Sequence, residues 1–336
     1  MSASEVHAPG SAGRLARAIG SRYRLAALTL IVIAFFGATA PGFLSRPTWI
    51  AVTTYIPEIL LLALGETVVV ITAGIDLSVG GVLDFSGMAS GIAMQAAVLH
   101  HEPAAVTIAL GALVALASGV GWGLVNGWII TRTRVTPFIV TLGTLGMATG
   151  GAYLFTNNGS SVSTIPAQLG QWTNTSILGW VPVLFLIGLL ASALIGWLLS
   201  RTRFGVRTYA IGSNMKSAVV AGINVRRHLL WVYVLSGLIA GADGFLVTAR
   251  FVTASPLAGA DDLLSAIAAV VIGGASLFGG KGTITGTFLG SVIIGVLLSG
   301  LILLGLESYW QTVATGLVIV LVVGADEYQH RERSDL

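Results

Sequence analysis

The chain alternates long apolar runs with short polar connections over almost its whole length. Ten runs approach or exceed the roughly 20 residues that an α-helix needs to cross the hydrocarbon core of a bilayer. These runs cover residues 25–44, 50–73, 79–99, 104–130, 136–156, 179–200, 229–251, 262–280, 283–304 and 306–325. The pattern predicts an all-α integral membrane protein, a polytopic bundle of about ten transmembrane helices. The 44 glycines add the expectation of closely packed helices and of short re-entrant or broken segments.

The composition agrees with a membrane-embedded chain and excludes several kinds of chemistry. Hydrophobic residues make up 55% of the chain and charged residues 9%, against about 25% charged residues in soluble domains. The chain has no cysteine, which excludes disulfides, thiolate catalysis and cysteine–metal sites. Its five histidines show no metal-ligand spacing, so no metal site is expected.

Lysine and arginine are distributed unevenly between the two sides of the predicted bundle. When the N-terminus is placed inside, all of the 17 basic residues except Arg46 and Arg250 fall on inner segments. This asymmetry follows the positive-inside rule and places both termini in the cytoplasm, which requires an even number of spans. It leaves no separate basic patch for a nucleic acid, so no nucleic-acid partner is expected despite the net charge of +3.

Three regions follow from this topology. Residues 1–24 form a basic cytoplasmic N-terminal arm, 25–325 a single transmembrane permease-like domain, and 326–336 a cytoplasmic tail. Within the transmembrane domain, the basic connection 200–228 is predicted to be cytoplasmic and is longer than a simple turn requires. The polar connection 156–175 lacks lysine and arginine and is predicted to be external.

The stretch "IGGASLFGGKGT" at 272–283 is close to a phosphate-binding loop. Such a loop needs G-x-x-x-x-G-K-[ST], but Ala275 stands where the first glycine is required and Gly282 where Ser or Thr is required. We therefore expect no nucleotide site here, and interpret the stretch as a helix–loop–helix break at the inner membrane surface. Lys281 should then face the cytoplasm.

Glycines recur at intervals of four residues in three places. Two runs contain three glycines each and one contains two: Gly119, Gly123 and Gly127; Gly282, Gly286 and Gly290; Gly237 and Gly241. Each run forms a smooth stripe on one helix face, which allows another helix to approach closely. These stripes predict helix packing and carry no information about a substrate.

Polar residues inside predicted spans are candidates for function because they are costly in a bilayer. The candidates for a translocation path are Glu66, Asp76, Ser78, Asp84 and Asn126. Asp76 precedes a helix start and is equally compatible with a capping role. For Glu66 and Asp84 a proton relay, a polar lining and a helix–helix hydrogen bond stay open. Glu58 and Asp243 are also intramembrane carboxylates, and for Asp243 we favour the hydrogen bond.

Five longer stretches carry a family resemblance. They are "ALGETVVVITAGIDLSVGG" (63–81), "TPFIVTLGT" (136–144), "RTRFGVRTYAIGSN" (201–214), "AIAAVVIGGASLFGGKGTITGTFLG" (266–290) and "SYWQTVATGLVIV" (308–320). In this order they resemble the permease subunits of bacterial ABC importers for monosaccharides, the ribose-type family. The resemblance covers nearly the whole chain after residue 50.

The resemblance implies the function, the partners and the location of the chain. It implies a permease subunit that forms the translocation path for a monosaccharide or related small polar solute, delivered by an extracytoplasmic sugar-binding protein. A second permease copy or a homologous permease completes the path. Separate ABC ATPase subunits dock on the cytoplasmic side of the bacterial inner (plasma) membrane. The chain itself is then not an enzyme and has no cofactor, because ATP and Mg are used by the partner ATPase.

The same resemblance gives the long cytoplasmic connection a role. Residues 209–223 correspond to a coupling helix that sits in a groove of the ATPase. The candidate coupling residues are Gly212, Asn214, Ala218, Gly222 and Ile223. Asn214 is expected to be an N-cap, and small residues such as Ala218 and Gly222 are expected to allow close docking. The alternative is a surface helix that is merely amphipathic.

The chain departs from the family pattern in three places, which indicates a divergent substrate or a heteromeric pairing. The departures are Met215, Lys216 and Ser217 after Asn214, Leu263 and Ser265 at acidic positions, and Thr149 with Gly150 near a frequent arginine. Two other functions stay open. One is an ABC permease for branched-chain amino acids or nucleosides, and the other is an ion-coupled secondary carrier that works without an ATPase.

Overall fold

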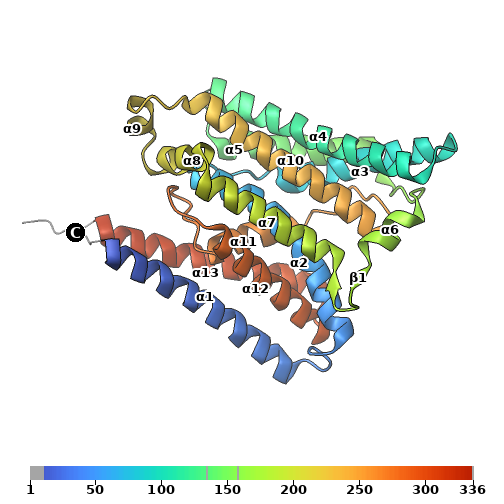
Figure 1. The fold of residues 1–336 in the computed structure, drawn as a ribbon, viewed down its shortest axis with the longest axis horizontal. Helices are drawn as coiled ribbons and strands as arrows, with labels where there is room; N and C mark the ends of the chain where they lie inside the picture. Colours follow the sequence, from blue (N-terminus) through green and yellow to red (C-terminus); the bar gives the residue numbers. More distant parts are fainter. Residues whose placement is uncertain (1–10, 134, 157–158, 335–336) are drawn as a thin grey trace, which may run out of the picture.

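The computed structural model describes residues 11–133, 135–156 and 159–334. It is an elongated bundle whose long helices run roughly along one direction (Figure 1). Residues 1–10 of the predicted N-terminal arm and 335–336 of the predicted tail lie outside the described residues.

The elements confirm the all-α prediction. Along the chain they are α1 (Ser11–Thr39), α2 (Arg46–Ile71), α3 (Val79–Leu99), α4 (Ala104–Arg132), α5 (Pro137–Leu154), α6 (Ala167–Thr173), β1 (Ser176–Ile177), β2 (Val181–Pro182), α7 (Val183–Arg201), α8 (Arg203–Ser213), α9 (Met215–Val220), α10 (Val225–Phe251), α11 (Asp262–Ile272), α12 (Ile284–Leu303) and α13 (Ser308–Ser334). The two short strands form an antiparallel hairpin in which Ser176 lies opposite Pro182.

The apolar helices match the predicted spans in number, but not all in length. In the described part of the chain, seven helices are long and apolar enough to cross a bilayer: α2, α3, α4, α5, α7, α10 and α12. Three shorter apolar helices cover Tyr23–Thr39, Asp262–Ile272 and Ser308–Leu321. The bundle of about ten apolar helices is therefore present, with some of them too short to cross alone.

The largest difference from the predicted spans is at α11. A span was predicted over 262–280, but the helix ends at Ile272 and its 11 residues rise only about 16 Å, roughly half of the hydrocarbon core. The physical reason is the glycine-rich segment that follows, in which Gly274, Gly279 and Gly280 adopt positive φ angles that a helix does not allow. The expectation of broken segments is confirmed here.

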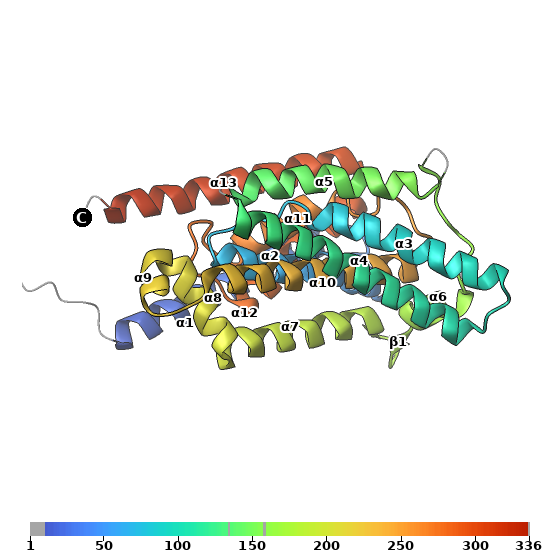
Figure 2. The same ribbon diagram turned by 90° about the horizontal axis from the view of Figure 1, so that it is seen from above.

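Helices α2 and α10 form the centre of the bundle. Helix α10 packs on α2, α3 and α4, and the most apolar stretch of α2 is 94% buried. A helix that is apolar on all sides requires such surroundings of protein. Helices α5 and α13 lie on one face of the bundle and α7 on the opposite face (Figure 2). Each of α5 and α7 buries only 28% of its most apolar stretch.

The predicted glycine stripes lie at close helix contacts. A Cβ atom added at Gly119 of α4 would lie 2.2 Å from the carbonyl oxygen of Gly237 of α10. A Cβ atom added at Gly290 of α12 would lie 2.0 Å from the carbonyl oxygen of Ala269 of α11. Both distances are far below van der Waals contact, so the backbones of these helix pairs touch directly.

The two ends of the bundle differ in what they carry. Helices α8 and α9 and the end of α13 gather at one end, and α6 with the β1–β2 hairpin lies at the other (Figure 1). These are named the α8–α9 end and the β1–β2 end below.

Candidate functional site

The connection between α2 and α3 folds back into the bundle. Ala73 takes a left-handed φ of 62°, and the chain then returns to the depth of Glu66, more than one turn before the end of α2. There the backbone N–H of Asp76 donates to both carboxylate oxygens of Glu66, each at 3.2 Å. Helix α3 therefore begins inside the bundle and not at its surface.

Around Asp76 the side chains of four helices form one polar network. The Asp76 carboxylate accepts hydrogen bonds from the Ser78 hydroxyl at 2.5 Å and from the Ser236 hydroxyl of α10 at 2.9 Å. The Ser78 hydroxyl accepts from the side-chain amide of Asn126 on α4 at 2.7 Å. The Asn126 oxygen in turn accepts from the Thr144 hydroxyl of α5 at 2.7 Å. With Glu66 of α2, these residues are named the Asp76 network.

The structure thus brings together four of the five path candidates: Glu66, Asp76, Ser78 and Asn126. Each of these four side chains is 1% exposed, and none of them lines a cavity described below. Their hydrogen bonds satisfy groups that would be costly to bury alone. The Asp76 carboxylate also accepts the Ser78 N–H at 3.1 Å, but Ser78 is itself the N-cap residue of α3, so this bond does not cap a free amide of the first turn.

Two members of the network were not predicted from the sequence. Ser236 and Thr144 are hydroxyl residues in apolar helices that contain other hydroxyl residues, such as Thr248 of α10 and Thr141 of α5. That pattern does not distinguish a network member from any other polar residue in a span, although Thr144 does lie in the family-like stretch 136–144. Ser236 and Asp243 are seven residues apart, so a helical period places them on the same face of α10. The sequence does not show that this face packs against α2.

Asp84, the fifth path candidate, is not part of the Asp76 network and binds instead the connection between α10 and α11. Its carboxylate accepts the backbone N–H of Gly259 at 2.7 Å, in the non-helical connection 252–261 before α11. The Tyr55 hydroxyl donates to the Asp262 carboxylate at 3.1 Å, at the first residue of α11. Tyr55 is the tenth residue of α2, about 14 Å along the helix from its start at Arg46. The connection therefore enters the membrane from the β1–β2 end, and α11 begins at mid-depth.

Backbone outside helices is tolerated at membrane depth only where protein buries it or where it lines a water-filled space. Part of this connection is open, since Leu257 is 56% exposed and Asp261 is exposed. Next to it lies a small cavity of about 70 Å³ with polar side chains from three helices, among them Tyr55, Ser265, Gln311 and Thr312. The surface at residues 257–264 is therefore partly exposed in the single chain, next to a small polar cavity.

This surface lies between α5 and α13. Helix α11 packs on α13, while Gly259 lies against Gly80 and Leu83 of α3, the helix on which α5 packs. On α5 itself, Cβ atoms added at Gly143, Gly146 and Gly150 would meet nothing within 4 Å. We name the surface formed by α5, α13 and residues 257–264 the α5–α13 face.

The predicted coupling residues surround the junction of α8 and α9. Asn214 is the N-cap of α9, and its side-chain oxygen accepts the backbone N–H of Ser217 at 3.0 Å, so the predicted capping role is confirmed. Ala218, by contrast, is only 3% exposed, because its methyl group packs inside the chain. Gly222 follows α9 with a positive φ of 81°, and Ile223 is half-buried.

Gly212 joins this region to the centre of the bundle. A Cβ atom there would lie 1.7 Å from the carbonyl oxygen of Ile71, the last residue of α2, and 2.6 Å from the backbone nitrogen of Gly280. The exposed surface of α8 and α9 combines basic side chains such as Arg207 and Lys216 with larger apolar ones. The apolar ones are Val206 (68% exposed), Met215 (47%), Val219 (57%) and Val220 (90%).

The glycine-rich stretch 272–283 fills the space between α2 and α8. The backbone N–H of Gly280 donates to the carbonyl of Ile71 at 2.9 Å, and the Tyr209 hydroxyl of α8 donates to the carbonyl of Gly282 at 2.8 Å. Burial raises the pKa of Tyr209, so its hydroxyl stays protonated and remains a donor. Lys281 is exposed at this end. The stretch therefore connects the end of α2 with α8.

Replacing Asp76 with alanine is expected to destabilise the protein strongly. The hydroxyls of Ser78 and Ser236 would lose their buried acceptor, and each unsatisfied group costs about 1–3 kcal/mol. Asp76→Asn keeps an acceptor oxygen and should cost less. Thermal unfolding in detergent measures both, with Asp261→Ala at an exposed position as the control. Equal melting temperatures for Asp76→Ala and the control would contradict the structural role of the network.

Comparisons with known proteins agree with the motifs. The model of the family described as "Branched-chain amino acid transport system / permease component" matches residues 48–323. The chain is 36% identical over 297 residues to the D-allose transport system permease protein of Escherichia coli (strain K12), and 88% of each chain is covered. It is 38% identical over 267 residues to the ribose import permease protein of Bacillus subtilis (strain 168), with 79% of this chain and 80% of the relative covered.

One solved structure, of a metal-chelate type ABC transporter in an inward-facing conformation, has a TM-score of 0.49 at 14% identity and covers 92% of this chain and 98% of its own. That likeness is too weak to inform the function. The relatives confirm the resemblance to ribose-type permeases that the sequence motifs indicated. Since the family model and both relatives match most of its length, the chain belongs to the family of transport permeases described as "Branched-chain amino acid transport system / permease component".

Proposed function

We propose that this chain is the permease subunit of an ATP-driven ABC importer that carries a monosaccharide across the bacterial inner membrane. The observation that carries the proposal is the similarity to permeases named for allose and ribose over most of the chain. These two sugars differ in carbon number, which supports a small polyol-like cargo without identifying it. The description of the family favours a second candidate, a branched-chain amino acid.

The proposed orientation places the α8–α9 end in the cytoplasm. The basic residues of 200–228 and Lys281 support it, because cytoplasmic connections carry the excess of Lys and Arg. Both termini are then cytoplasmic, and the β1–β2 end faces the extracytoplasmic binding protein. ATP and Mg²⁺ are bound by separate ATPase subunits.

The exposed apolar side chains of α8 and α9 form the proposed ATPase-docking surface. Four apolar side chains here are 47–90% exposed: Val206, Met215, Val219 and Val220. A group of exposed apolar side chains is typical of a surface that binds a partner. Behind them, Gly212 contacts the end of α2, and residues 272–283 contact both α2 and α8. A movement of α8 and α9 would therefore be transmitted to α2 and to the Asp76 network.

The α5–α13 face is the proposed wall of the translocation path. The non-helical residues 257–261 of this face need water or protein opposite them. A second permease copy that faces the same surface supplies both. Asp84 then acts through its hydrogen bond to Gly259, by holding this wall in place. Glu66, Asp76, Ser78 and Asn126 support the break between α2 and α3 behind it.

Uptake into vesicles tests the proposed function. The permease is reconstituted together with its ATPase and binding protein, and labelled ribose, allose and leucine are supplied with ATP inside the vesicles. We expect ATP-dependent uptake of a sugar and none of leucine. Uptake of leucine alone would support the amino-acid candidate and refute the sugar assignment. Uptake by the permease alone, driven by a proton or sodium gradient, would refute the ABC importer.

The docking surface makes a separate prediction. Val220→Asp should lower ATP-dependent uptake by about tenfold or more, the result of losing roughly 1.4 kcal/mol of docking energy. The residue is 90% exposed, so the substitution should leave the melting temperature of the permease unchanged. Val135→Asp, an exposed valine of the α4–α5 connection, is the matched control. Normal uptake by Val220→Asp would rule out α9 as a docking contact.

A further inference from the structure

A groove runs along the outside of the bundle between α7 and α12. It has a volume of about 480 Å³ and is lined by residues of α7, by Tyr209 of α8 and by residues 283–288. Helix α7 lies on the face of the bundle opposite α5 and α13 (Figure 2), so this groove is separate from the α5–α13 face. Nothing in the proposed transport path occupies it.

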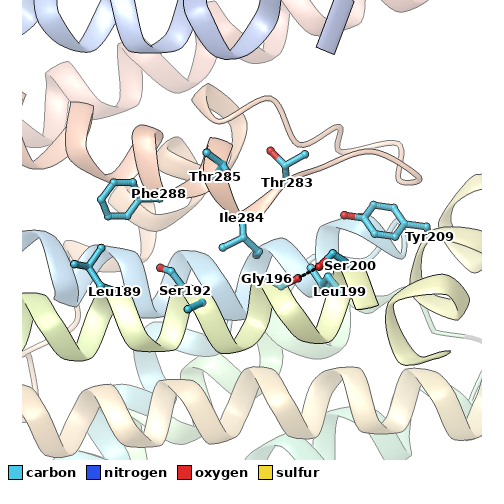
Figure 3. A pocket seen from close by; sticks show the side chains of 11 residues that line it. Leu189, Ser192, Gly196, Leu199, Ser200, Tyr209, Thr283, Ile284, Thr285 and Phe288 are labelled. Carbon is cyan, nitrogen blue, oxygen red and sulfur yellow. Dashed lines mark hydrogen bonds between the residues drawn. The ribbon is translucent and has the colours of Figure 1, made fainter. Parts of the chain in front are cut away.

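The chemistry of the groove changes along its length. Figure 3 shows Leu189 and Phe288 at one end and Ser200, Tyr209 and Thr283 at the other. The hydroxyl-bearing end lies next to α8, at the α8–α9 end of the bundle. The apolar end lies further along α7, toward the middle of the membrane. This order matches a lipid molecule, which has a polar head at the membrane surface and apolar chains below it.

One polar group inside the groove has no partner of its own. Ser192 is one of the lining residues, and its hydroxyl oxygen is buried and has no hydrogen bond among the described residues. It sits between the apolar end and the hydroxyl-bearing end (Figure 3). A buried hydroxyl without a partner is costly, and an ester oxygen of a bound lipid would accept a hydrogen bond from it.

Four cations lie close in sequence to the residues that line the hydroxyl-bearing end. Arg201 follows Ser200 directly and Arg203 follows it by three residues, while Arg207 precedes Tyr209 and Lys281 precedes Thr283 by two residues each. All four cations are exposed, and none forms a salt bridge within the described chain. The segments that line the groove, 189–209 and 281–288, contain no acidic residue. The charge therefore favours an anionic head group.

We propose that this groove binds one anionic phospholipid of the leaflet at the α8–α9 end. Its acyl chain lies against Leu189 and Phe288, and its phosphate lies near the Thr283 hydroxyl and the neighbouring cations. The proposed lipid site does not depend on which solute is transported. Only the identification of this leaflet as the cytoplasmic one rests on the orientation in the proposed function. A bound lipid would connect α7 with α8 and with the start of α12, all three of which line the groove.

Native mass spectrometry of the full-length permease tests the proposal by a readout that does not involve transport. Phosphatidylglycerol is titrated against phosphatidylcholine in detergent. We expect wild-type protein to retain phosphatidylglycerol preferentially. Removing two cations with Arg201→Gln/Arg203→Gln should weaken its binding about 30-fold, roughly fivefold per charge. Arg226→Gln/Arg227→Gln removes two exposed cations of α10 that are not close in sequence to any residue lining the groove, and should have little effect.

A second variant fills the groove without changing the charge. A Cβ atom added at Gly196 would come no closer than 3.8 Å to Ile284, so a larger side chain has room to extend into the groove. Gly196→Leu should abolish retention of phosphatidylglycerol while leaving the gel-filtration profile unchanged. Equal binding of the two lipids by wild-type protein, or wild-type binding by the charge variant, would show that the proposal is wrong.

Another copy of the chain is the main competing occupant. The chain has no cysteine, so Ala193→Cys introduces a single thiol on the lining of the groove. If the groove is a lipid site, oxidation in membranes should produce no disulfide-linked dimer. Efficient formation of such a dimer would identify the groove as a protein interface and overturn the lipid assignment.

Discussion

Gly119→Ala is expected to prevent the permease from folding to a stable bundle. The added methyl group would lie 2.2 Å from the carbonyl oxygen of Gly237 and 2.9 Å from the Cα atom of Gly241. Both contacts are with backbone, which has no side-chain rotamer to change, so α4 and α10 must separate. Overpacking in a well-packed core costs about 1–3 kcal/mol and occasionally more. We expect the upper end or beyond, because α10 is also central to the packing of α2 and α3.

Gly121→Ala on the same helix is the matched control. A Cβ atom at Gly121 would meet nothing within 4 Å, and alanine favours a helix over glycine by about 1 kcal/mol. The control should therefore be as stable as the wild type or slightly more stable. Expression as a fluorescent fusion, followed by gel filtration and thermal unfolding, separates the two variants. If both variants behave alike, the close contact between α4 and α10 does not limit stability.

The glycine stripe at Gly119 could be predicted from the sequence because it depends only on the spacing of residues that are close in sequence. Spacing of four residues places glycines on one face of a helix whatever lies opposite. The apolar runs are local in the same sense, and most of the helices coincide with them. The identity of the partner helix is not local: nothing in the run from Gly119 to Gly127 indicates that α10 packs there. Only the structure pairs Gly119 with Gly237.

The Asp76 network shows where reasoning from the sequence stops. Glu66, Asp76, Ser78 and Asn126 stand out as polar residues in apolar surroundings, and the first three also lie in the family-like stretch 63–81. Their hydrogen bonds depend on the return of the chain after α2, which brings Asp76 back to Glu66. A seven-residue connection does not reveal such a return by composition. The role of Asp84 was hidden for the same reason, since its partner Gly259 is 175 residues away.

Residues 262–280 illustrate a different limit. The run is apolar enough for a span, and apolarity alone does not distinguish a crossing helix from a half-helix followed by a buried loop. The glycines after Ile272 were the available signal, and they predicted a break. They did not show that α11 begins at mid-depth, because that position is fixed by the contact between Tyr55 and Asp262 on different helices.

Arg250 was one of two basic residues that departed from the positive-inside pattern, and the structure explains its position. Its guanidinium donates to the carboxylate of Glu58 on α2, forming the one salt bridge found in the described part of the chain. The side chain of Glu58 is 6% exposed and that of Arg250 is 19% exposed. Because a buried carboxylate neutralises its charge, Arg250 has little influence on the orientation of the chain in the membrane. The sequence had not indicated this partner for Glu58.

Arg250→Met is therefore expected to destabilise the protein by about 3–5 kcal/mol, because it leaves the Glu58 carboxylate buried without its cation. The double variant Glu58→Leu/Arg250→Met removes both charges and should recover most of this loss, since a well-packed apolar pair often replaces a buried ion pair without cost. Arg46→Met, at the other outer arginine, is the control. Arg46 is exposed and donates to the carbonyl of Gly179, so its removal should cost about 1 kcal/mol or less.

Thermal unfolding of the three variants in detergent decides between a buried pair and a solvated one. A buried pair predicts a low melting temperature for Arg250→Met and a large recovery in the double variant. A solvated pair predicts that Arg250→Met and Arg46→Met have similar melting temperatures. It also predicts that adding Glu58→Leu to Arg250→Met lowers the melting temperature further. The first outcome would place the cost in the unpaired carboxylate and not in the lost arginine. It would also show that the contact between α2 and α10 holds a charge at membrane depth only because both partners are present.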